Sequence, residues 1–101
     1  MEAHLHPRLA ALPQRRLLGF EVAVASGVRA RLLGLALMPR ERAGAGLLIP
    51  RCASVHTFGM RFDLDLVFLD RAGRPLLARR GVPPHRFVCC RGAEAVLELP
   101  H

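Results

Sequence analysis

The sequence has no Lys, Asn, Tyr or Trp, and all fifteen of its basic residues are Arg. The formal net charge of +7 therefore comes from one residue type. The residues that dominate the chain have GC-rich codons, so codon bias explains Arg in place of Lys without any selection for phosphate contacts. With no Tyr or Trp to stack on bases, and no basic run longer than a pair, the chain lacks the pattern of a dedicated nucleic-acid binder. Nonspecific binding of polyanions or nucleic acid through surface Arg stays an alternative, because a basic protein attracts polyanions.

Long apolar runs are also missing. No segment approaches the roughly 18 consecutive apolar residues of a transmembrane helix. The first eight residues are interrupted by His4, His6, Pro7 and Arg8, unlike a secretory signal. Three cysteines cannot complete a set of disulfides. We therefore expect a cytoplasmic protein with no membrane partner.

The length of 101 residues and the hydrophobic content of 51% fit one globular domain. We expect residues 1–14 to form a flexible N-terminal arm and residues 15–101 to form a single β-rich domain. Alternation of polar and apolar residues, with turn signals between the segments, predicts a series of short strands. These predicted strands cover residues 17–25, 47–49, 53–60, 64–69, 75–78, 86–90 and 95–99.

One helix is predicted, beginning after Ser26 and ending near Leu37. Ser26 can cap the first free N–H groups, and Pro39 disfavours helical geometry in the residue before it. Gly34 in the helix interior suggests that another group packs closely against the backbone there. The order of elements predicts an α+β, mainly β fold. In it, an antiparallel sheet curls into a small, partly closed barrel with the one helix across one end.

The sharpest candidate site combines His56 and Asp65. Asp65 lies on a predicted strand that is apolar on both faces, where a carboxylate is costly unless it is hydrogen-bonded or paired. His56 shares a face of its own strand with Phe58 and Met60. If the two strands are neighbours, Asp65 would orient His56 as a general base. The competing interpretation is structural, because buried Asp and His side chains often bond to backbone groups.

A metal site is the second candidate. Zinc ligands usually come in pairs two to four residues apart. Cys52 and His56 have a tolerable spacing, but Cys89 and Cys90 are adjacent on a predicted strand and should point to opposite faces. We therefore expect no metal and no cofactor.

The third candidate is an anion site in the C-terminal half, where Arg residues gather around the predicted turns. Arg suits bidentate contacts with carboxylate or phosphate. Arg61 and Arg86 are the candidate anion-binding residues. A solvated basic rim is the competing interpretation.

Several segments in the middle of the chain resemble a known family. They are Gly46–Pro50, Ser-Val-His-Thr-Phe-Gly-Met-Arg-Phe at residues 54–62, Leu64–Asp70 and Ala95–Leu99. Together they are similar to the bacterial and archaeal family called domain of unknown function 192, in particular to its actinobacterial-type variant. The resemblance covers roughly residues 17–99 and implies a small β-rich fold, with no established reaction or ligand. The chain departs from the family at Asp63, where members commonly have Pro, and we expect no leading signal or lipoprotein segment of the kind that many members carry.

We expect a small non-catalytic ligand-binding or accessory domain. Its pocket would be formed by His56, Thr57, Met60 and Asp65, and would take a small anionic or sugar-like ligand. The alternative is a small hydrolase-like enzyme with His56 as base and Asp65 as its orienting group. Whether the domain is an enzyme, and its oligomeric state, stay open on the sequence alone.

Overall fold

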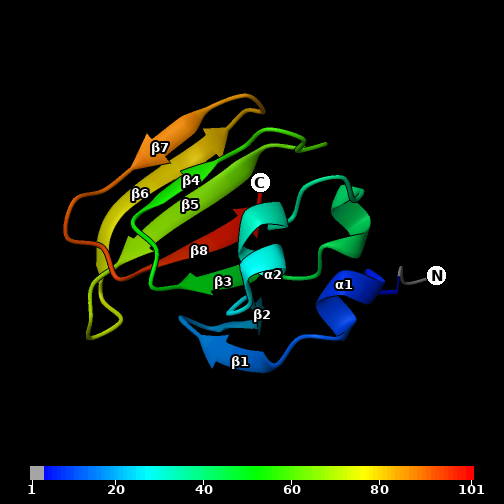
Figure 1. Cartoon of the computed structure of the whole chain (residues 1–101), viewed down its shortest axis with the longest axis horizontal. Coiled ribbons are helices and arrows are strands. Elements are labelled where there is room, and N and C mark those ends of the chain that lie inside the picture. Colours follow the sequence, from blue (N-terminus) through cyan, green and yellow to red (C-terminus); the bar gives the residue numbers. More distant parts are fainter. Residues whose placement is uncertain (1–3) are drawn as a thin grey trace.

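The computed structural model describes residues 4–101. It contains eight strands: β1 (Gln14–Leu17), β2 (Phe20–Val24), β3 (Leu47–Pro50), β4 (Ser54–His56), β5 (Leu64–Leu69), β6 (Pro75–Val82), β7 (Phe87–Cys89) and β8 (Ala95–Pro100). It also contains the short helices α1 (Pro7–Ala10) and α2 (Val28–Leu33) and the 3-10 helix η1 (Arg40–Arg42). Six strands form the main sheet in the order β1-β2-β3-β8-β5-β6, and β4 pairs with β7 in a separate two-stranded sheet (Figure 1).

The mainly β character is confirmed, but the predicted barrel is wrong. The main sheet stays open, with β1 and β6 as its two edges. It is also mixed, because β3 runs parallel to β2 while the other neighbours are antiparallel. The long connection that carries α2 and η1 allows the chain to return to the same end of the sheet, as parallel neighbours require. β4 and β7 do not join the main sheet but pair with each other.

The predicted helix ends earlier than expected, and it is not the only one. α2 stops at Leu33, and Gly34 follows with φ +52° and ψ −129°, a conformation that is accessible mainly to glycine. The helix therefore ends at Gly34, before the stop signal at Pro39 is reached. The expected close approach at Gly34 is confirmed, since a Cβ there would lie 2.9 Å from Oε1 of Glu98.

The predicted N-terminal arm contains α1, which packs onto the domain within the described residues 4–14. Leu9 is only 1% exposed and belongs to the core. The N–H of His6 donates to the carbonyl of Arg42 at 2.9 Å. Residues 1–3 of the predicted arm lie outside the described part of the chain.

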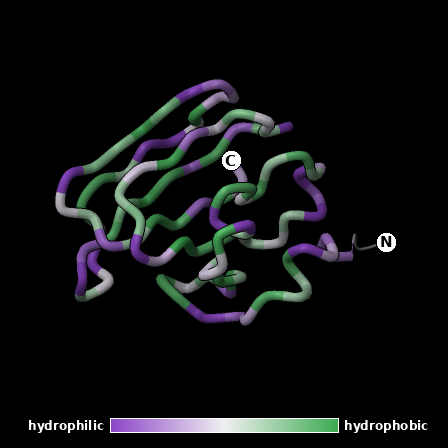
Figure 2. Tube along the Cα trace, in the orientation of Figure 1, coloured by the Kyte–Doolittle hydropathy of each residue, from purple (hydrophilic) through white to green (hydrophobic). Residues whose placement is uncertain are grey.

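Two apolar clusters cover the two faces of the main sheet. The larger, inner cluster joins Leu64, Leu66 and Phe68 of β5 to Leu35 and to Val55 of β4. The smaller, outer cluster consists of Val22, Leu48, Leu69 and Leu97. Hydrophobic segments run along the central strands (Figure 2). Their alternation between the two clusters follows from the period of two residues in a strand.

Within the described residues, no helix has the length and apolar character needed to cross a membrane.

The position of Gly34 gives a stability prediction. Gly34→Ala should lower the free energy of unfolding by about 2–4 kcal/mol, because it adds backbone strain and a close contact with Glu98. Gly73→Ala is the matched control: Gly73 has φ +82° but open space around its Cβ position, so only about 1 kcal/mol should be lost. Urea unfolding of both variants measures the difference. Equal losses of unfolding free energy in the two variants would show that the close contact with Glu98 does not add to the cost of Gly34→Ala.

Candidate functional site

The inner face of the main sheet holds one buried carboxylate, Glu98 of β8. Its register partners are Leu47 of β3 and Leu66 of β5, so it lies between two neighbouring strands in the middle of the sheet. Glu98 is 3% exposed. Among the described residues, its Oε1 has no hydrogen-bond partner. A buried acceptor in this state costs free energy until a donor reaches it.

Burial raises the pKa of Glu98 to about 7, and the backbone N–H of Leu35 partly opposes this by lowering it. Desolvation penalises the charged form of an acid and leaves the neutral form favoured. The carboxyl is therefore divided between its protonated and ionised forms near neutral pH. It can donate a hydrogen bond in one form and accept in both.

Glu98 lines an open cavity of about 310 Å³ between segment 31–36 and the two-stranded sheet. Its apolar lining includes Leu32, Phe58 and Phe87, which are all exposed large hydrophobic side chains. Its other polar lining residues are Arg31, Cys52, Ser54 and His56. The cavity thus combines an apolar rim with one buried carboxyl, a composition typical of small-molecule sites.

His56 lies on the rim of this cavity and is exposed. Its ring centroid is 5.5 Å from that of Phe58, with the two rings tilted. Phe58 is in turn 6.0 Å from the ring of His85. The imidazole therefore belongs to a cluster of exposed rings at the cavity mouth.

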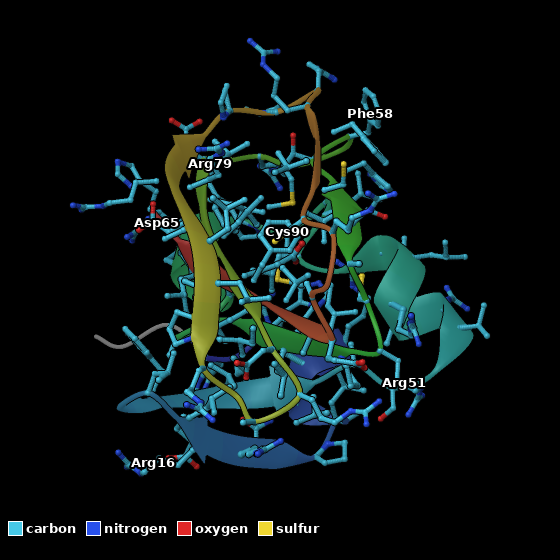
Figure 3. The ribbon with its side chains drawn as sticks, turned by 90° about the vertical axis from the view of Figure 1, so that its left-hand side faces the viewer. Arg16, Arg51, Phe58, Asp65, Arg79 and Cys90 are labelled. Atoms are coloured by element: carbon cyan, nitrogen blue, oxygen red, sulfur yellow. The ribbon has the colours of Figure 1, made fainter. Side chains whose placement is uncertain are left out.

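The structure does not bring Asp65 to His56. Asp65 alternates with Leu64 and Leu66 on β5, so it faces the outer side of the sheet, and it lies on the other side of β6 from Phe58 (Figure 3). Its Oδ1 accepts the N–H of Gly81 at 2.8 Å and lies 2.8 Å from Nδ1 of His101.

The Gly81 bond falls at an irregularity in the pairing of β5 with β6. Asp65 thus stabilises a distorted stretch of sheet, in agreement with the structural interpretation. The premise that this carboxylate needs partners was sound. The strand pattern did not reveal that the partners would lie on the face away from His56.

The other two predicted pocket residues differ in position: Thr57 is packed in the interior, and Met60 lines the cavity. Thr57 is fully buried, and its Oγ1 donates to the carbonyl of Pro83 at 2.7 Å and accepts the N–H of Arg86 at 2.8 Å. It therefore ties the chain after β4 to the loop before β7. Met60 is buried and lines the cavity. Of the four predicted residues, His56 and Met60 reach the cavity with Glu98.

Arg61 and Arg86, the predicted anion-binding residues, are both exposed. Neither guanidinium forms an ion pair with another described residue, and neither residue lines the Glu98 cavity. Arg86 contributes to the structure through its backbone, which bonds to Thr57. The structure does not place these two residues in one binding site.

The candidate metal ligands are dispersed. Within residues 4–101, no three His, Cys, Asp or Glu side chains come together as a metal site would require. Cys52 is at the cavity, where its Sγ donates to the carbonyl of Ser54 at 2.9 Å. All three cysteines are free thiols.

Sequence reasoning missed Glu98, although the signal was present. The segment Ala95–Leu99 places one carboxylate among apolar residues on both strand faces, the same pattern that singled out Asp65. Gly34 was a second signal, because it indicated close packing against the backbone at the point where Glu98 lies.

The comparisons with known proteins agree with this fold. Residues 11–101 match the model of the domain of unknown function 192 (DUF192), described as "Uncharacterized ACR". The chain belongs to the DUF192 family. The resemblance expected from the sequence is therefore confirmed, and the match covers most of the chain. The search of curated proteins gave no match to this DUF192 domain.

Two solved structures are similar to this DUF192 domain in fold. A protein from Sinorhizobium meliloti 1021, described as a "putative transcription regulator", has a TM-score of 0.72 at 22% identity, over 80% of this chain and 68% of that one. A protein of unknown function from Novosphingobium aromaticivorans DSM 12444 has a TM-score of 0.64 at 15% identity, over 94% of this chain and 86% of that one. At these identities the likeness concerns the fold alone.

The raised pKa of Glu98 predicts how stability depends on pH. A carboxyl whose pKa rises on folding stabilises the folded state fully below its unfolded value of 4.5, and this contribution is lost as pH rises through about 7. The wild type should lose about 3 kcal/mol between pH 4.5 and pH 8 from this group. Glu98→Gln should remove this part of the pH dependence, as measured by urea unfolding across that range.

Glu41→Gln is the control for Glu98→Gln, because Glu41 is exposed on η1. Its pH profile should follow that of the wild type. A Glu98→Gln profile that also follows the wild type would contradict a raised pKa at Glu98.

Proposed function

We propose that this DUF192 domain binds a small molecule in the Glu98 cavity and does not convert it. The ligand has an apolar face and a hydrogen-bond donor, such as a hydroxyl or an amide N–H. The observation that carries the proposal is that Glu98 lines an open cavity and that its buried Oε1 lacks a partner among the described residues. A donor on the ligand would satisfy this atom and recover the free energy that its burial costs.

The rim supports the same type of ligand. Phe58 is 53% exposed and Phe87 is 66% exposed, and both line the cavity. Exposed aromatic rings beside a polar group are suited to a ligand that is apolar on one side and polar at one end. Of the two ligand classes expected from the sequence, the sugar-like one fits the base of the cavity better. An anionic group would be repelled there by ionised Glu98.

Binding is favoured over hydrolysis by the location of the two predicted catalytic groups. The carboxylate that would orient His56 as a base is bonded to Gly81 and lies near His101 instead. A general base needs to be held in one geometry relative to the proton that it removes. Among residues 4–101, the side chain of His56 has the ring contact with Phe58 and no hydrogen bond to position it.

Two fragments that share a benzyl group and an ether or hydroxyl oxygen, and differ by one methyl group in place of the hydroxyl proton, test this proposal. Benzyl alcohol carries a hydroxyl donor, and benzyl methyl ether has the same ring without the donor. Backbone NMR shifts at Gly34 and Leu35 report binding beside Glu98. We expect the wild type to prefer the alcohol by about fivefold, the value of one hydrogen bond to a buried acceptor.

Glu98→Leu should abolish this preference, because it removes the acceptor, whereas Glu98→Gln should keep most of it. His56→Ala should change the preference less than twofold, since His56 lies on the rim. Equal binding of the two fragments by the wild type would contradict the proposal, as would shifts confined to residues away from the cavity.

A further inference from the structure

A second concavity, of about 210 Å³, lies between α1 and α2. Its walls are mostly apolar and come from Leu9, Leu12, Ala30 and Leu33. Gly34 lines both this cavity and the Glu98 cavity, so the two are neighbours. We call this second cavity the interhelix cavity. In Figure 1 the two helices that form it lie close together at one end of the molecule.

Two arginines complete the interhelix cavity, Arg8 from α1 and Arg29 from α2. Arg8 is half-buried, and its Nη2 donates to the carbonyl of Ala36. Burial lowers the pKa of Arg8, and the nearby charge of Arg29 lowers it further. The fold thus holds two positive charges close together at one apolar cavity.

Neither of these charges is compensated by a side chain that the structure describes. The arginines with acidic partners lie elsewhere, at Arg71 with Glu94 and at Arg74 with Asp70. A guanidinium carries five N–H donors, so the bond to Ala36 leaves most of those on Arg8 available. Two guanidinium groups with free donors are well suited to a carboxylate, which accepts such bonds in pairs.

We propose that the interhelix cavity binds an amphipathic anion, a carboxylate on a short aliphatic chain. The carboxylate pairs with Arg8 and Arg29 and relieves their mutual repulsion. The chain packs against Leu9, Leu12 and Leu33. This site is distinct from the Glu98 cavity, although Leu33 and Gly34 line both, and its charged groups are the two arginines.

Hexanoate, titrated at low ionic strength and followed by backbone NMR shifts of Leu12 and Ala30, which line the interhelix cavity but not the Glu98 cavity, tests the proposal. Hexanoate should bind, and each methylene removed from its chain should weaken binding by about fourfold. Acetate has the carboxylate without the long aliphatic chain, and hexanol has the aliphatic chain without the charge. Neither should shift these residues at concentrations where hexanoate does.

Arg29→Gln should weaken hexanoate binding by about tenfold, because it removes one charged donor group. Arg29 is exposed, so this variant should fold normally, which far-UV circular dichroism would verify. Arg16→Gln is the matched control, an exposed arginine on β1 outside both cavities, and should bind like the wild type.

Three results would overturn the proposal. The first is equal binding of hexanoate and hexanol, which would make the site merely apolar. The second is an equal loss in Arg16→Gln and Arg29→Gln, which would reduce the effect to net charge. The third is that hexanoate changes the backbone NMR shifts only of residues that line the Glu98 cavity.

Discussion

The carboxyl of Glu98 lies close to the backbone at Gly34, and the chain after α2 is arranged around this close approach. Oε1 of Glu98 occupies the space that a side chain at residue 34 would fill. The chain turns there out of α2, through a conformation suited to glycine, and brings Leu35 and Met38 into the core. The same turn separates two cavities, with the buried carboxyl on one side and two arginines on the other. Glu98 lines the first of these cavities, and Gly34, against which its carboxyl lies, lines both.

The two acidic residues of the central strands show how much the sheet face matters. Asp65 and Glu98 lie on adjacent strands, but one faces the outer side of the sheet and the other faces the inner side. Asp65 is satisfied by the backbone of Gly81 and lies against His101. Glu98 keeps one oxygen without a partner among the described residues and faces a cavity. A polar group that its own structure satisfies contributes to stability, whereas one left open is available for a ligand.

Local patterns in the sequence predicted much of the fold. The alternation at residues 64–69 and 95–99 gave strands that the structure contains, and the glycine at 34 indicated a close approach. Neither the open main sheet nor the separate pairing of β4 with β7 was predictable, since both depend on contacts between distant segments. His56 and Met60 both line the cavity with Glu98, although His56 is exposed and Met60, which follows β4, is buried. Pairing His56 with Asp65 failed because alternation shows that two faces exist, but not which face of one strand meets another strand.

Ligand binding in the Glu98 cavity depends most on the environment of this carboxyl, and its pKa measures that environment directly. The ¹³C shift of the Glu98 carboxyl carbon, followed by NMR as a function of pH in the free protein, gives that value. We expect a midpoint at about 7, because burial raises the pKa of this carboxyl. A midpoint near the ordinary value of 4.5 would mean that the carboxyl is solvated or already paired. It would then offer no reason for a ligand to bind there.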